Sequence, residues 1–175
     1  MEPKGGKEKE DLVVNINNRA GATEDDIKHA KKSVEIVWNN LIGKDMVVNV
    51  EFVNNITDDE GNIRDSAGAY NPDTDKILIA LSSNSFKTFV KGCGSQEAAV
   101  ALITAHEMGH RFQLLRDGKV EHQPDTDSDE YINGTQEAEA WDIALHTFKS
   151  NWYEASGSFE YKGKVFTIPE KSKFD

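Results

Sequence analysis

The segment 96–115 places the tightest constraint on the fold, because it combines a helical pattern with three polar residues that suit a metal site. These residues are His106, Glu107 and His110, in the order His-Glu-x-x-His. Two residues four apart on a helix share one face, so both imidazoles can bind the same metal ion. Glu107 lies beside that face, where its carboxylate can take a proton from a metal-activated water. The apolar residues that lead into the motif indicate that this helix is buried.

A catalytic metal site of this type usually has three protein ligands, so a third ligand must come from elsewhere in the chain. A histidine ten positions after His106 is excluded, since Arg116 stands there. The segment 136–142 offers Glu137 and Glu139 instead. At about 100° per residue of a helix, Glu137 falls in an apolar stripe and Glu139 on the opposite side. Because a carboxylate on a buried stripe needs a compensating cation, Glu137 is the expected third ligand.

Other roles for these residues stay open. Glu137 could be a first-turn glutamate that stabilises the helix dipole and turns towards solvent. His122, on a polar loop, is a second candidate for the third ligand, and His122 or Tyr131 could donate a hydrogen bond to an oxyanion. The motif itself could be the remnant of a site that no longer binds metal.

In these two segments the chain resembles the His-Glu-x-x-His zincins of the glutamate subclass, the gluzincins, and especially minimal bacterial zincins such as the ImmA/IrrE-like proteins. In those families the third ligand tends to stand in the pattern Glu-x-x-small, and the segment from Glu137 to Ala140 fits it. Trp141 departs from the pattern, because such families often have Asp or Asn at this position to steady a ligand histidine. The missing third histidine and Met-turn separate the chain from the metzincins.

The resemblance implies a zincin-like fold and a zinc ion (Zn2+) held by His106, His110 and Glu137, with Glu107 as the catalytic base. The implied activity is hydrolysis of peptide bonds by a metal-activated water, so the protein would be a zinc metallopeptidase acting on a peptide or protein. The strand at 76–81 would be the edge strand to which an extended substrate adds. The alternative is a zincin-like module that binds zinc without cleaving and serves as a sensor or protein-interaction domain.

The rest of the chain predicts an α+β fold, with a small mixed sheet of about four strands packed on helices. One domain over residues 11–175 is expected after a flexible segment at 1–10, since 175 residues fall within the range of a single domain. Helices are expected from the N-cap Thr23 to Gly43, from the N-cap Ser95 to Leu115, and from Thr135 to about Asn151. Strands are expected at 12–16 and 46–53, in a hairpin over 66–81 that turns at 71–73, and in a hairpin over 159–168 that turns near 162–163.

The charge of the chain argues against a nucleic acid partner. The formal net charge of −11 at pH 7 repels phosphate backbones, and the basic residues form no stripe. No apolar run approaches the roughly 20 residues that cross a bilayer, so no membrane span is expected. The sequence carries no signal of the oligomeric state.

A single cysteine, Cys93, excludes a disulfide within the chain and favours a reducing compartment. No secretory signal is present in the sequence, so the cytoplasm is the expected location, with secretion as the alternative if a signal has been removed. Cys93 precedes the motif helix between two glycines, and no neighbour in the sequence is expected to lower its pKa. It is therefore interpreted as a bystander.

The loop 125–130 spaces acidic residues at alternate positions, which superficially suggests calcium. An EF-hand requires glycine at its sixth position and a bidentate glutamate at its twelfth, where this chain has Glu130 and Gln136. A solvated acidic loop is the preferred interpretation, and an acidic binding protein organised by calcium is a third functional class that this loop suggests.

Overall fold

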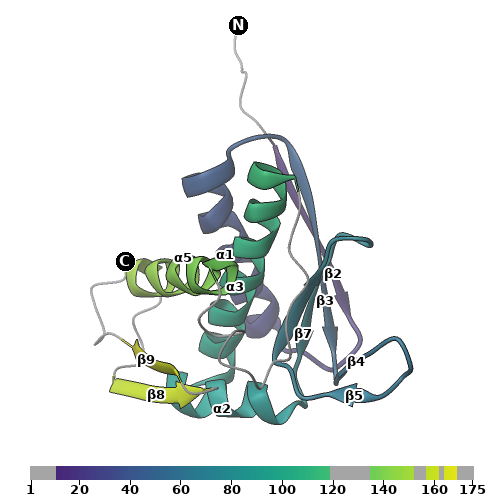
Figure 1. The fold of residues 1–175 in the computed structure, drawn as a ribbon, viewed down its shortest axis with the longest axis vertical. Helices are drawn as coiled ribbons and strands as arrows, with labels where there is room; N and C mark the ends of the chain where they lie inside the picture. The colour runs from purple at the N-terminus through teal and green to yellow at the C-terminus, as the bar shows by residue number, and fades with distance from the viewer. Residues whose placement is uncertain (1–10, 119–134, 152–156, 162–163, 169–175) are drawn as a thin grey trace, which may run out of the picture.

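The computed structural model describes residues 11–118, 135–151, 157–161 and 164–168, which form an α+β fold (Figure 1). The segment 1–10, the loop 125–130, His122 and Tyr131 lie outside the described residues. The elements are, in chain order, β2 (Leu12–Asn18), α1 (Glu24–Val37), η1 (Trp38–Ile42), β3 (Met46–Val53), β4 (Ile56–Thr57), β5 (Ile63–Arg64), β6 (Gly68–Asn71), β7 (Lys76–Ala80), α2 (Asn84–Cys93), α3 (Gln96–Asp117), α5 (Thr135–Asn151), β8 (Gly157–Tyr161) and β9 (Lys164–Ile168).

The expected mixed sheet of four strands is confirmed, in the order β2-β3-β7-β6. The first three strands are parallel, whereas β6 runs antiparallel to β7. Along β3 the side chains of Met46, Val48, Val50 and Phe52 are buried, while Val47 between them is exposed. This period of two reflects a sheet that the described helices cover on one face, where α1 and α3 lie (Figure 1).

The expectation that strand 76–81 forms the edge of the sheet is wrong. β7 pairs with β3 on one side and with β6 on the other, from Gly68↔Ile79 to Asn71↔Lys76. The predicted hairpin is present, and its first strand, β6, pairs with β7 on the side away from β3. Ile77, Ile79 and Ala80 are buried, as expected for a strand with neighbours on both sides. The edge strand beside α3 is therefore β6.

The first predicted helix is present but changes its winding near its end. Thr23 caps α1 through a reciprocal capping box, in which its hydroxyl accepts from the Asp26 amide and the Asp26 carboxylate accepts from the Thr23 amide. From Trp38 the chain continues as one π-helical turn, closed by a hydrogen bond from Gly43 N to Trp38 O at 2.8 Å. Gly43 then ends the helix at φ 67°, a backbone angle that favours glycine.

Helix α2 was not predicted from the sequence. It begins at Ser83, whose hydroxyl accepts a hydrogen bond from the Phe86 amide, and it buries Phe86, Phe89 and Cys93. The short ladder β4–β5 around the turn at 58–62 was likewise not predicted. The predicted helix at 135–151 and the final antiparallel hairpin, β8 with β9, are both present.

Helix α3 runs through the centre of the fold, in contact with α1, α2, α5, β6 and β7. Ser95 caps it as expected, accepting a hydrogen bond from the Ala98 amide. Every residue from Ala98 to His110 is buried, so the helix is enclosed on all sides over more than three turns. No helix in the described ranges is long and apolar enough to cross a membrane.

Candidate metal centre

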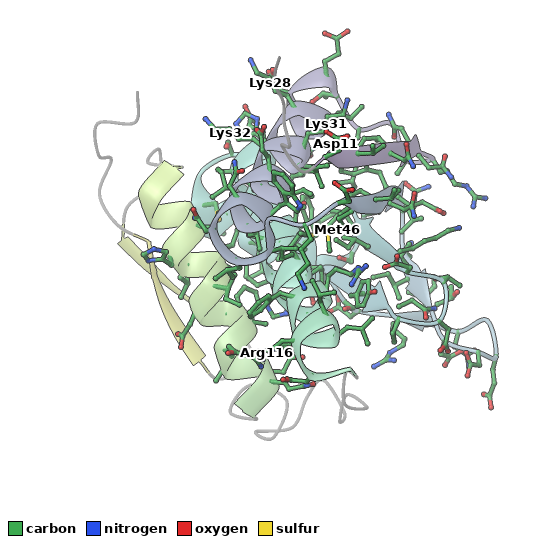
Figure 2. The ribbon with its side chains drawn as sticks, turned by 90° about the horizontal axis from the view of Figure 1, so that it is seen from above. Asp11, Lys28, Lys31, Lys32, Met46 and Arg116 are labelled. Atoms are coloured by element: carbon green, nitrogen blue, oxygen red, sulfur yellow. The ribbon has the colours of Figure 1, made fainter. Side chains whose placement is uncertain are left out.

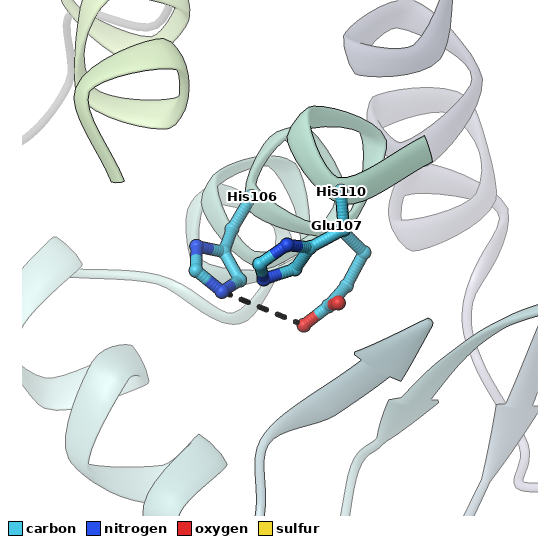
Figure 3. Close-up of side chains that lie close together, drawn as sticks. All are labelled: His106, Glu107 and His110. Carbon is cyan, nitrogen blue, oxygen red and sulfur yellow. Dashed lines mark ion pairs between the residues drawn. The ribbon is translucent and has the colours of Figure 1, made fainter. Parts of the chain in front are cut away.

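Helix α3 brings His106, Glu107 and His110 together in its buried middle (Figure 3). Their exposed fractions are 2%, 4% and 3%. One ligand atom from each residue lies within 4.8 Å of the others, so this group could hold a metal ion. His106 Nε2 lies 3.9 Å from Glu107 Oε2, a distance that places the carboxylate beside the imidazole without a hydrogen bond.

Helix α5 adds Glu137 to this group. Its Oε1 lies 3.2 Å from His106 Nε2 and its Oε2 lies 3.0 Å from His110 Nε2. Among the described residues, neither oxygen has a partner with hydrogen-bond geometry, although Glu137 is only 3% exposed. Two imidazole nitrogens and a buried carboxylate therefore converge on one small volume, as metal ligands do.

Two glycines allow the surrounding elements to approach this centre closely. A Cβ atom on Gly109 would lie 3.1 Å from Ala140 Cα, so the glycine allows α5 to pack tightly on α3. A Cβ atom on Gly68 of β6 would lie 2.6 Å from Ile103 Cγ2 and 3.2 Å from Glu107 Oε2. The edge strand thus passes directly over the carboxylate of Glu107.

The ring of His110 is held by a polar network. Its Nδ1 lies 2.9 Å from Oε1 of Gln113, one turn further along α3. The Gln113 amide donates to Gln136 O at 2.9 Å and to Glu139 Oε1 at 2.8 Å, both on α5. Arg116, labelled in Figure 2 where the end of α3 meets α5, donates to both carboxylate oxygens of Glu139. Glu139 therefore bonds to the network and does not reach the two histidines.

The ring of His106 is held by packing. It lies against Trp141 with ring centroids 3.9 Å apart, and Trp141 stacks in turn on Phe89 at 5.5 Å. His106 Nδ1 is buried and has no hydrogen-bond partner among the described residues. Trp141 thus steadies the ring of His106 by direct contact.

Burial and neighbouring charges shift the titration of this group. Burial raises the pKa of Glu107, and the charge of Glu137 adds to the increase. Burial also lowers the pKa of His110, but the contacts with Glu137 and Glu107 outweigh it and raise the pKa to about 9. For Glu137 burial is outweighed by His106 and His110, which hold its pKa well below the usual range. When no metal is bound, these contacts favour the ionised form of Glu137 and the charged form of His110.

A small cavity of about 10 Å³ adjoins the centre. It is lined by His106, Glu107, Trp141, Phe89, Ile103 and residues 66–68. A cavity of roughly 10–15 Å³ holds one water molecule. The described centre thus has room for a water beside Glu107.

The structure brings together all four residues that the sequence nominated, His106, Glu107, His110 and Glu137. Cys93 is buried outside this group, and burial raises the pKa of its thiol to about 12. The sequence analysis did not connect Gln113 with this group, although its position three residues after His110 places both side chains on the same helix face.

No protein-family model matches the chain, and no similar protein was found among curated proteins or solved structures. The fold and the centre define the class of protein on their own. It is an α+β protein with a buried group on α3 that could hold a metal ion.

Proposed function

We propose that this protein is a zinc metallopeptidase of the zincin kind, with His106, His110 and Glu137 as zinc ligands and Glu107 as the general base. The observation that carries the proposal is the approach of both Nε2 atoms to the buried carboxylate of Glu137, at 3.2 and 3.0 Å and without hydrogen-bond geometry. A bound cation would compensate the buried carboxylate and accept the lone pairs of all three side chains.

The donor set favours zinc. Two histidines and one glutamate form one of the common ligand sets of catalytic zinc. With tetrahedral zinc–ligand bonds of about 2.0–2.2 Å, neighbouring ligand atoms lie about 3.3–3.6 Å apart. The oxygens of Glu137 lie slightly closer than this to the two histidines, at 3.2 Å from His106 Nε2 and 3.0 Å from His110 Nε2. The same donors also accept other divalent transition metals, so a test for metal should cover the ions from manganese to zinc.

The chain's own contribution to the chemistry centres on Glu107. Zinc, when bound, lowers the pKa of a coordinated water molecule and polarises the substrate carbonyl. Glu107 Oε2, at 3.9 Å from His106 Nε2, stands beside the ligand set. From there its carboxylate takes a proton from the attacking water and passes it to the leaving amine. Ile103 and Trp141, which line the adjoining cavity, limit the access of other water molecules.

The substrate of this proposed peptidase is an extended peptide that adds to β6. In the described part of the sheet β6 pairs only with β7, so its outer edge offers main-chain hydrogen bonds. A peptide at this edge would pass Gly68, the residue of β6 closest to Glu107.

A second candidate function is supported by the closed surroundings of the centre. His106, Glu107 and His110 are each at most 4% exposed, and the adjoining cavity of about 10 Å³ is far smaller than a peptide. These dimensions favour a zinc-binding module that does not cleave and acts as a sensor or an interaction domain. In that case the histidines are required for biological activity, whereas Glu107 is dispensable.

The first experiment is elemental analysis of the untagged protein by mass spectrometry, after exposure to zinc and removal of excess metal. One zinc per chain is expected in the parent and in Asp142→Asn, an exposed carboxylate change on the same helix. Glu137→Gln is expected to lose the metal. A parent that binds no divalent metal would end both proposals, and zinc retained in folded Glu137→Gln would remove Glu137 from the ligand set.

A further inference from the structure

The side chain of Gln113 is fully buried and uses all of its hydrogen-bonding atoms. Its two amide hydrogens go to two acceptors on α5, the carbonyl of Gln136 and the carboxylate of Glu139. A rotated amide would turn its oxygen towards both acceptors and lose two hydrogen bonds. The carbonyl oxygen of Gln113 must therefore face His110 Nδ1.

This orientation decides which nitrogen of His110 carries a hydrogen. An amide oxygen only accepts, so the 2.9 Å contact requires a hydrogen on Nδ1. A neutral His110 then has its lone pair on Nε2, the atom that lies 3.0 Å from Glu137. Only this tautomer can bind a metal at Nε2 while keeping the hydrogen bond to Gln113.

We propose that Gln113 is a positioning residue that fixes the tautomer and ring plane of His110 for metal binding, by holding its own amide between α3 and α5. The inference rests on the proposed role of His110 as a ligand. Since Gln136 directly precedes Glu137, one amide aligns the imidazole on α3 with the helix that carries the carboxylate. The ion pair of Glu139 with Arg116 fixes the second acceptor.

The two histidines differ in what holds their rings in place. His106 stacks on Trp141 and has no hydrogen bond at Nδ1 among the described residues. His110 has its ring held at Nδ1 by Gln113. Loss of the Gln113 amide would therefore disturb His110 specifically, whereas a residue that merely links two helices would change stability without changing metal affinity.

The test compares two Gln→Met substitutions on the same helix. Gln113→Met keeps the length of the side chain but removes the amide, and zinc affinity is expected to fall by about 10- to 100-fold, as for other residues that orient ligands. Gln96→Met is the control, because the Gln96 amide also joins α3 to another helix, donating to Asp26 Oδ2 at 2.7 Å. Its zinc affinity should stay within about twofold of the parent.

Affinity is measured by competition with a chromophoric zinc chelator, and folding is checked by circular dichroism. The role of Gln113 is overturned if folded Gln113→Met binds zinc as tightly as the parent, or if Gln96→Met is weakened to the same extent.

A nuclear magnetic resonance measurement tests the hydrogen bond without metal. The His110 Nδ1 proton should exchange slowly with water in the metal-free parent and in Gln96→Met, and rapidly in Gln113→Met. No protected proton in the folded parent would overturn the role of Gln113. A parent that shows the protected proton but binds no zinc would instead contradict the proposed function.

Discussion

At the scale of single residues, Glu107 is distinguished from the other carboxylate of the centre by its contacts. Glu137 approaches both imidazoles, whereas Glu107 lies 3.9 Å from His106. We predict that Glu107→Gln keeps bound zinc but loses peptide hydrolysis by at least about 100-fold, because a positioned base contributes that much. Zinc content and cleavage of a mixed peptide library are measured together. Unchanged cleavage by the zinc-loaded variant would contradict the assignment of the base.

Gly68 is a residue at which any side chain must disturb the centre. A Cβ atom there would meet Ile103 Cγ2 at 2.6 Å and the carbonyl oxygen of Leu78 at 3.0 Å. We predict that Gly68→Ala lowers the free energy of unfolding by about 1–3 kcal/mol, the usual effect of overpacking. Urea unfolding followed by circular dichroism measures it. Adding Ile103→Ala removes the closest contact, so it should make Gly68→Ala less damaging than in the parent background.

Cys93 provides a test of burial that is independent of the metal. Its thiol is 1% exposed, and burial raises its pKa to about 12. A raised pKa means that the folded state favours the protonated thiol, so this contribution to stability is present below the unfolded pKa and is lost as pH rises towards 12.

We therefore predict that alkylation of Cys93 by iodoacetamide stays slow and nearly constant between about pH 7 and pH 9 in the folded protein. In urea the same reaction should accelerate with pH, because a free thiol has a pKa of about 8.5. Mass spectrometry follows the modification. Fast alkylation that rises with pH under native conditions would show that the thiol is accessible.

At the scale of elements, the crossing of α3 and α5 determines whether Glu137 reaches the histidines. A Cβ atom on Gly109 would lie 3.1 Å from Ala140 Cα and 3.3 Å from its Cβ. We predict that Gly109→Ala pushes α5 away and lowers zinc affinity about tenfold, because Glu137 moves with its helix. Chelator competition measures this change.

The same variant has a mixed effect on stability, because alanine favours a helix by about 1 kcal/mol over glycine while the new contact opposes it. Ala140→Gly in the same chain removes the contact with the Ala140 Cβ but leaves the backbone contact. The double variant should therefore recover only part of the zinc affinity. Full affinity in Gly109→Ala alone would show that the crossing is not limiting.

The sequence was most informative for elements with local signals. Alternating residues predicted β3, and the caps Thr23 and Ser95 predicted where α1 and α3 begin. The apolar stripe separated Glu137 from Glu139, and the structure gives these residues different neighbours.

Features that depend on contacts between distant segments could not be predicted in this way. The position of β6 outside β7 depends on how a hairpin docks against α3, which no local pattern encodes. Helix α2 has only ten residues, and its isolated aromatic residues suit a strand as well as a helix. The role of Gln113 depends on acceptors that α5 supplies from more than twenty positions away.

At the scale of the whole molecule, the candidate metal centre lies where helix α5 and the sheet strand β6 both pack against α3. Its carboxylates come from α3 and α5, and β6 closes over it from the sheet. In the described part of the chain, the imidazoles of His106 and His110 compensate both buried carboxylates when no metal is bound. A cation at this point would bind the folded chain and not the unfolded one, so metal binding and stability should be linked.

We predict that removing the metal with a chelator lowers the Tm and that returning zinc restores it. Free zinc at 100 times its Kd stabilises a fold by about 2.7 kcal/mol, which corresponds to about 5–11 °C for a chain of this size. Differential scanning calorimetry of the parent, Glu137→Gln and Asp142→Asn separates a specific site from general binding to an acidic protein. The parent and Asp142→Asn should respond alike, and Glu137→Gln should not respond. An equal shift in all three proteins would place the zinc on the acidic surface, because only a bound ion held by Glu137 makes the response depend on that side chain.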